Sequence, residues 1–169
     1  YSALQSQTSG SQNTALGRST GLGLTTGSYN TFLGAYAGLS NTSASHNTFI
    51  GGTAGRYNTT GASNTFVGAF SADNNTITGS NNTALGYLSG NTGTNDITTG
   101  NQNTLLGAST AVSSATATNQ IVIGYGAIGK GDNTVTIGNG DITAWSASDD
   151  NEVDLGSSSI EFKDLYIDG

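Results

Sequence analysis

The stretch "GSYNTFLGAYAG", residues 27–38, decides the fold, because its motif "NTFLG" (residues 30–34) recurs along the chain. The first three steps between copies are each 17 residues long, and the later steps are 18, 21, 16 and 14 residues. Self-similarity at such a period is the signature of a repeat architecture. We therefore predict one repeat array over residues 1–138. Copies begin at Asn13, Asn30, Asn47, Asn64, Asn82 and Asn103, and looser copies, one residue longer before their glycine, begin at Asn119 and Asn133.

Each motif copy has the composition of a short strand. Threonine, aromatic and branched apolar residues stand between asparagine and glycine, which favours a strand bounded by turns. A glycine three residues before the asparagine predicts a tight turn with positive φ, and a second glycine-rich corner follows the strand, as in residues 34–38. Strand, corner, return and corner make one coil of an all-β solenoid or β-roll. Eight coils stacked about 4.8 Å apart would span roughly 40 Å. The turn glycines are Gly10, Gly27, Gly61, Gly79 and Gly100.

Stacking of the coils brings equivalent side chains into columns. The asparagines would form a ladder in which side-chain amides hydrogen-bond from coil to coil, and Phe32, Phe49 and Phe66 would stack. The predicted ladder consists of Asn13, Asn30, Asn47 and Asn64.

The apolar pair in each motif predicts an oligomer. Adjacent strand residues point to opposite faces, so Phe32 and Leu33 cannot both enter one core. The coil of residues 30–46 has only four large apolar residues, which suits a thin two-layered roll with one of the pair outside. An outer apolar stripe would promote aggregation unless it were covered. We therefore predict a homotrimeric fibre that buries the stripe of Leu16, Leu33, Ile50, Val67, Leu85 and Leu106.

Composition and charge exclude several classes of function. The chain has 26 glycines, 9% charged residues and no cysteine, proline or methionine, so we expect no disulfide or thiolate metal site and no native start at Tyr1. No apolar run reaches the roughly 20 residues of a membrane span, so we expect no membrane insertion. Residues 1–129 are neutral, whereas residues 130–169 carry the whole net charge of −7. Without a basic stripe, nucleic-acid binding is not expected.

The motifs resemble those of known fibrous proteins. The step that ends in "NTVTIG" (residues 133–138) is similar to repeats of trimeric autotransporter adhesin heads, and the whole array resembles shafts of phage tail fibres and spikes. Residues 150–169 are similar to the segment that leads into an endosialidase-type intramolecular chaperone. The resemblance implies a trimeric β-roll over residues 1–138, an acidic C-terminal β segment over residues 139–169, and a chaperone beyond Gly169 that sets the register of three chains.

Motifs typical of enzymes do not fit their required context. "GYGAIG" (residues 124–129) matches a dinucleotide-binding pattern, but another strand repeat follows instead of the necessary helix. "GRSTG" (residues 17–21) matches a nucleophile elbow and also lacks a following helix. The single histidine, His46, stands in a turn, where a solvated surface role is typical. We predict no catalytic residue, no cofactor and no enzyme activity.

Carboxylates offer two weak alternatives. The cluster at residues 149–154 could bind calcium through oxygen ligands, but it lacks the spacing of known calcium loops, which favours a solvated acidic loop. Paired carboxylates hydrolyse glycosidic bonds, yet Asp73 and Asp96 are the only acidic residues before residue 130. We predict no metal site.

Two binding functions stay open beside a structural role. Thr14, Thr31, Thr48 and Thr65 form a row of the kind found in ice-binding solenoids, although their side of the strand also carries the apolar stripe, which favours burial. Aromatic side chains at the corners could stack on a glycan or pack between coils. The candidate glycan contacts are Tyr29, Tyr36, Tyr57, Phe70 and Tyr87.

The preferred interpretation is a structural shaft of a viral tail fibre or spike that attaches to a bacterial host surface, with a host glycan as a further partner. The alternative is a trimeric adhesin on a bacterial cell surface. The expected location is therefore the virion or the bacterial exterior.

Overall fold

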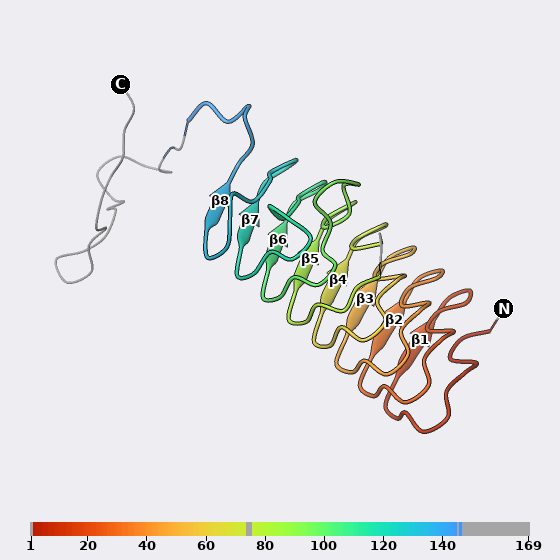
Figure 1. Cartoon of the computed structure of the whole chain (residues 1–169). Helices are drawn as coiled ribbons and strands as arrows, with labels where there is room; N and C mark the ends of the chain where they lie inside the picture. The colour runs from red at the N-terminus through yellow and green to blue at the C-terminus, as the bar shows by residue number, and fades with distance from the viewer. Residues whose placement is uncertain (1, 74–75, 145, 147–169) are drawn as a thin grey trace.

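A computed structural model describes residues 2–73, 76–144 and 146 and shows an all-β solenoid, which confirms the predicted fold class. Within these residues there are eight strands and no helix. They form one parallel sheet in which each strand pairs with the next one in sequence, so the coils advance along a single axis (Figure 1). The strands are β1 (Thr14–Leu16), β2 (Thr31–Leu33), β3 (Thr48–Ile50), β4 (Thr65–Val67), β5 (Thr83–Leu85), β6 (Thr104–Leu106), β7 (Ile121–Ile123) and β8 (Val135–Ile137).

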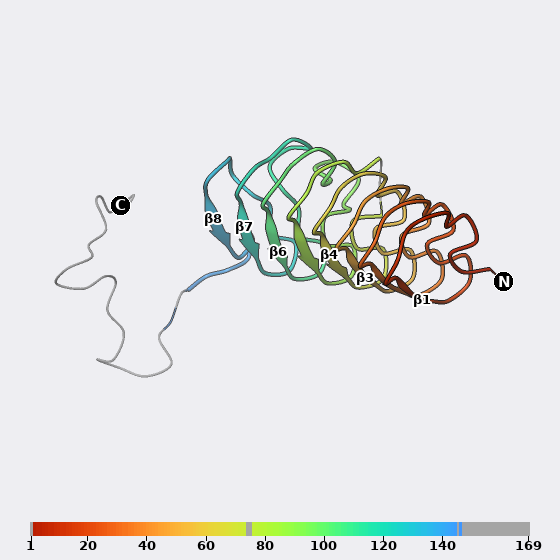
Figure 2. The ribbon, with the colours of Figure 1, turned by 90° about the horizontal axis from the view of Figure 1, so that it is seen from below.

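The register of the sheet aligns motif with motif. Thr31 lies opposite Thr48, Phe32 opposite Phe49, and Leu33 opposite Ile50. The strands lie side by side along one face, and the rest of each coil loops around the other side (Figure 2). Among the described residues, this return consists of turns joined by backbone hydrogen bonds between coils and by isolated bridges, such as Asn58 with Ile77. The sheet is therefore the regular side of each coil.

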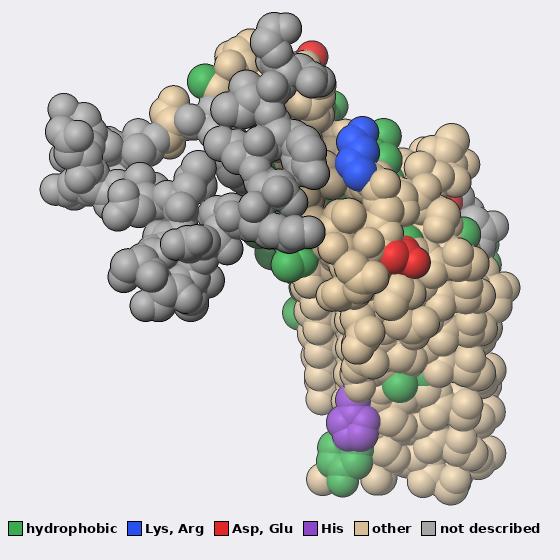
Figure 3. Space-filling view, turned by 60° about the vertical axis from the view of Figure 1, so that its left-hand side comes forward, with side chains coloured by type: hydrophobic (Ala, Val, Ile, Leu, Met, Phe, Trp, Pro, Cys, Tyr) green, Lys and Arg blue, Asp and Glu red, His purple; other side chains and the backbone are tan. Residues whose placement is uncertain are grey.

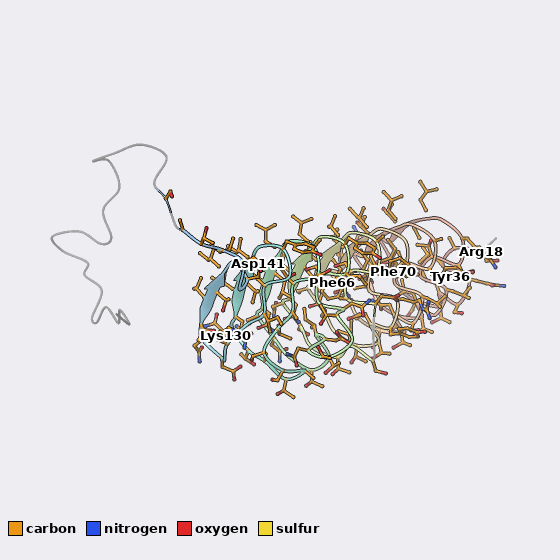
Figure 4. The ribbon with its side chains drawn as sticks, turned by 90° about the horizontal axis from the view of Figure 1, so that it is seen from above. Arg18, Tyr36, Phe66, Phe70, Lys130 and Asp141 are labelled. Atoms are coloured by element: carbon orange, nitrogen blue, oxygen red, sulfur yellow. The ribbon has the colours of Figure 1, made fainter. Side chains whose placement is uncertain are left out.

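A narrow apolar core runs along the axis. Phe32, Phe49 and Phe66 are fully buried, and successive rings stack with centroids 5.2 and 5.0 Å apart. Figure 4 labels Phe66 within the stack of coils. Leu24 and Ile77 belong to the same buried cluster from the return side. The predicted phenylalanine column is confirmed.

The asparagine ladder is also confirmed. Asn30 Oδ1 accepts a hydrogen bond from the backbone N–H of Asn47 at 3.0 Å, and Asn30 Nδ2 donates to the carbonyl of Ala44 at 2.9 Å. The Asn30 amide thus satisfies an N–H and a carbonyl of the following coil, which would otherwise be buried without partners. The same pattern continues at Asn82 and Asn103.

The two looser motif copies were aligned wrongly. Gln120, not Asn119, continues the ladder, because its N–H donates to Asn103 Oδ1 at 3.0 Å. Ile121 pairs with Thr104, a step of 17 residues that restores the regular spacing. Asn119 precedes the ladder position, and its side chain bonds Asn133 on the outside. The position of a residue in the ladder is therefore set by strand pairing between coils and not by the asparagine that begins the local motif.

The turn glycines have a different role from the predicted one. The positive φ falls on the residue before the asparagine, such as Tyr29 at 60° and His46 at 62°. Gly27 is required by close approach instead, since a Cβ there would lie 2.1 Å from the carbonyl oxygen of Ala44 in the next coil. At the corner after the strand, Gly34 combines both constraints, because its φ is 131° and a Cβ there would lie 2.4 Å from Gly51 O.

β8 ends at Ile137, next to the predicted boundary of the array at residue 138. Most of the predicted acidic C-terminal β segment, with residues 150–169 and the acidic cluster at residues 149–154, lies outside the described residues. The division into residues 1–138 and 139–169 stays a prediction.

Candidate functional site

The outer face of the sheet carries the first and third residue of every strand. In β2 the central Phe32 is fully buried, whereas Leu33 is 42% exposed. The expectation that these neighbours face opposite sides is confirmed, because the narrow interior takes only the middle residue of each three-residue strand. The middle residue is fully buried in β2 to β7 and half-buried in β1 and β8, and the paired strands make one face from β1 to β8.

The third strand residue forms an outer apolar stripe. Leu16 is 68% exposed at the first strand, and Ile137 is 42% exposed at the last. None of the eight described strands has a charged residue at an outward position. We call this surface the outer stripe; it consists of Leu16, Leu33, Ile50, Val67, Leu85, Leu106, Ile123 and Ile137.

The threonine row runs beside the outer stripe on the same face. Thr14, Thr31 and Thr65 are exposed in the single chain, and Thr48 is half-buried. The row lies outside the coil in a single chain, and its predicted burial together with the apolar stripe stays a prediction. A second molecule would be needed to cover it. The row continues through Thr83 and Thr104 and ends in the apolar Ile121 and Val135.

The aromatic side chains predicted as glycan contacts pack against different neighbouring residues. Tyr29 stacks on the ring of His46, with centroids 5.0 Å apart, and Figure 3 shows the histidine against a hydrophobic side chain at one edge. The guanidinium of Arg18 lies 5.3 Å from the ring centre of Tyr36, and the two lie together toward the N-terminal end in Figure 4.

The other three candidates form two further contacts. Tyr57 lies beneath the guanidinium of Arg56 at 4.4 Å. Phe70 and Tyr87 meet edge to face, with centroids 6.0 Å apart, and both are exposed. The structure thus brings together only Phe70 and Tyr87 among the five predicted residues, and their role in glycan contact stays a prediction.

One ion pair lies among the described residues, on the return side of the coils. Arg56 Nε is 3.7 Å from Asp73 Oδ1, and the Asp73 side chain is only 11% exposed. Burial raises the pKa of Asp73, while the nearby Thr53 hydroxyl and the charge of Arg56 oppose that rise. The burial cost of this carboxylate therefore exceeds the gain from its partners.

The remaining sequence motifs occupy structural positions. The segment after β7 leads into β8 and not into a helix. Ser19 lies at a corner with a φ of 52°, and Asp96 accepts hydrogen bonds from the backbone of Thr92 and Gly93. In the described part of the chain, no group of three or more potential metal ligands gathers, and no helix is long and apolar enough to cross a membrane.

Sequence reasoning missed a cavity of about 480 Å³ beside residues 91–94. The only signal in the sequence was the 21-residue step between Asn82 and Asn103, the longest in the array.

The face in Figure 3 is mostly covered by uncharged polar side chains and backbone, with isolated charged groups.

The outer stripe is thus a regular feature that follows all eight described strands, and the cavity is an irregular one. In comparisons with known proteins, the chain matches no family model, no curated protein and no solved structure.

Proposed function

We propose that this chain is a shaft segment of a homotrimeric fibre, of the kind that phage tail fibres and spikes use for attachment to a bacterial surface. The observation that supports the proposal is the outer stripe, an uncharged apolar row that follows the axis over all eight strands. Five members of the stripe are exposed and Ile50, Val67 and Ile123 are half-buried. An uncovered apolar row of this kind is typical of a protein interface. The role is structural, without catalysis.

The interior of the coil suits a rigid spacer. Continuous parallel pairing, the asparagine ladder and the stacked phenylalanines connect every coil to the next. Each repeat contacts its neighbours only, so the length of such an array grows with the number of repeats. The shaft would hold a distal binding region away from the virion or cell to which the fibre is attached.

Three chains are proposed because each chain presents one such face. If the chains lie parallel and in register, equivalent leucine, isoleucine and valine residues meet around a common axis. The threonine row would then be covered at the margin of the interface, where its hydroxyls can bond between chains. A bacterial cell-surface trimeric adhesin uses the same assembly and is the alternative setting.

The exposed threonine row favours one further candidate, an ice-binding solenoid. Six consecutive strands begin with threonine, and parallel pairing places these residues in one column. That function needs a free face, whereas the shaft needs a covered one. The mass of the particle in solution therefore distinguishes the two functions.

The test is the molar mass by light scattering of the wild-type chain and of Leu33→Asp and Ile50→Asp. A charge in a buried interface without a partner costs several kcal/mol, so the two variants should dissociate to monomers. The matched control is Thr60→Asp, at an exposed residue on the return side, which should stay trimeric. A wild-type chain that is monomeric at micromolar concentration contradicts the proposal, and ice-growth inhibition by that monomer would favour the other candidate.

A further inference from the structure

The cavity beside residues 91–94 is built by three successive coils. Leu88 and the loop of residues 91–94 come from the coil after β5, Ala111 from the coil after β6, and Ile128 from the coil after β7. Its volume of about 480 Å³ lies within the range of small-molecule sites.

Two departures from the regular repeat open this cavity. The coil from Asn82 to Asn103 is the longest in the array, and its extra residues form an overhanging loop. The second residue after each corner glycine also becomes smaller along the axis, from Leu88 through Ser109 to Gly126. We call the residues two positions after the corner glycines the corner column; it consists of Ser19, Tyr36, Thr53, Phe70, Leu88, Ser109 and Gly126. The backbone is left-handed at each of them, with φ of 55° at Leu88, 55° at Ser109 and 62° at Gly126.

The overhanging loop is held in place by hydrogen bonds. The buried carboxylate of Asp96 accepts the N–H groups of Thr92 at 2.6 Å and Gly93 at 2.8 Å. Asn91 Nδ2 donates to the carbonyl of Phe70 at 3.0 Å, which fastens the loop to the preceding coil. The wall of the cavity is therefore preformed, which lowers the entropy cost of binding a ligand.

The lining combines an apolar floor with free hydroxyls. Leu88, Ala111 and Ile128 supply the floor. The hydroxyls of Thr92, Thr94 and Ser109 make no hydrogen bond within the part of the chain that the structure describes, and no charged side chain lines the cavity. The matching ligand is small, uncharged and rich in hydroxyls, with one apolar face.

We propose that this cavity binds a neutral pyranose unit of a glycan. One face of such a ring carries C–H groups that can pack on Leu88 and Ile128, and its hydroxyls can exchange hydrogen bonds with the three free side-chain hydroxyls. The absence of charge in the lining favours neutral over acidic sugars. The site differs from the five corner aromatics and does not depend on the trimer.

An adjoining hollow of about 280 Å³ extends this site toward the C-terminal end of the array. The two share Gly126 and Ile128, and the second also contacts Lys130, which Figure 4 labels near the C-terminal end of the array. A glycan chain would continue from the cavity in this direction.

The corner column supplies clean blocking variants. Gly126→Tyr places a ring in the cavity, and Tyr36 already adopts the same left-handed backbone at the equivalent position, with a φ of 61°. Ser109→Phe is a second blocking variant, for which Phe70 with a φ of 58° is the precedent. The matched control is Ser19→Tyr, in the same column in the first coil and far from the cavity along the axis.

The experiment measures binding of D-glucose, D-galactose, D-mannose and N-acetyl-D-glucosamine to the full chain by saturation-transfer NMR and titration. Wild-type protein and Ser19→Tyr should bind at least one of these sugars with a Kd of about 1 mM. Both blocking variants should lose binding at least tenfold while keeping the wild-type circular dichroism spectrum.

Three outcomes would overturn the proposal. The first is that wild-type protein binds none of the four sugars at a sugar concentration about 20-fold above that Kd. The second is that both blocking variants fold and bind sugar as wild-type protein does. The third is that the blocking variants form particles of lower mass than the wild type. The last outcome would identify the cavity as a contact between protein chains. Leu33→Asp should keep sugar binding even as a monomer, so failure of the trimer and failure of this site are separable.

Discussion

The coils around β2–β4 and those around β5–β7 fill their interiors with different side chains. In the first region the steps are uniform, and stacked Phe32, Phe49 and Phe66 fill the interior. In the second region the inward strand residues are Ala84, Leu105 and Val122, while Ile97 and Val112 from the return complete the core. Both regions keep the same strand register. The return of a coil can thus change its length, whereas the strand changes its residues but keeps its length and register.

The physical reason lies in where the hydrogen bonds are. The strand and ladder residue bond the coil below and the coil above, so a shift there would leave buried backbone groups without partners on both sides. Residues added to the return can bulge into solvent and satisfy their polar groups locally, as the loop held by Asp96 does.

The largest expected effect separates the two cores. Phe49→Ala removes a ring stacked on both sides and should lower the free energy of unfolding by about 3–5 kcal/mol. Val122→Ala, at the same strand position in the second region, should cost about 2 kcal/mol because two methyl groups are lost. Urea denaturation of both variants measures the difference. Equal losses would show that the phenylalanine stack contributes nothing special.

The second prediction compares two glycines. At Gly51, with a φ of 136°, a Cβ would lie 2.4 Å from Gly68 O, so Gly51→Ala must displace the backbone of the next coil. We expect a loss of about 3 kcal/mol. At Gly126, with a φ of 62°, a Cβ would lie 3.9 Å from its nearest neighbour, so Gly126→Ala meets no clash and should cost only the roughly 1 kcal/mol of a left-handed backbone. Thermal melts test both; a neutral Gly51→Ala would refute the close-approach argument.

The third prediction concerns the asparagine ladder. Asn82 Nδ2 donates to Gly100 O at 2.8 Å, and its Oδ1 accepts the N–H of Asn103 at 3.0 Å. Asn82→Ala should therefore cost about 2 kcal/mol. Asn47 lacks a partner for Nδ2 within the described part of the chain, and the carbonyl of Gly61 accepts from Asn58 Nδ2 instead. Asn47→Ala should cost about half as much, and a reversed order in urea midpoints would contradict the ladder as described.

The smallest effect concerns the ion pair between Arg56 and Asp73. Because the pKa of Asp73 is raised in the folded state, the folded protein binds the proton more tightly than the unfolded chain does. Stability should fall as pH rises through the interval from the unfolded pKa to the raised one, and the loss persists above it. Asp73→Asn should remove that step, with an effect within about 1 kcal/mol. The check is the difference in unfolding free energy between variant and wild type at pH 3 and pH 7. A variant that becomes less stable relative to wild type as pH rises would show the opposite linkage.

Much of the fold could be predicted from the sequence because the period of the motif marks the strand in each coil. The columns of asparagine and phenylalanine followed directly, as did the opposite orientation of Phe32 and Leu33. Asn119 was wrongly taken as the start of a motif copy. The pairing of Ile121 with Thr104, which places Gln120 in the ladder, is visible only in the structure. The cavity could not be predicted either, since it depends on three returns that are distant in sequence.

By itself, the sequence determined that the chain is an all-β array with one inward and two outward residues in each strand. A 17-residue repeat of Asn-Thr, two apolar residues and glycine allows only that local geometry. Only the tertiary structure decided which asparagines find partners, why Gly27 cannot carry a side chain, and where the corner column opens beneath the overhanging loop. These features depend on distances between coils, and those distances are fixed only when the conformation of every return is known.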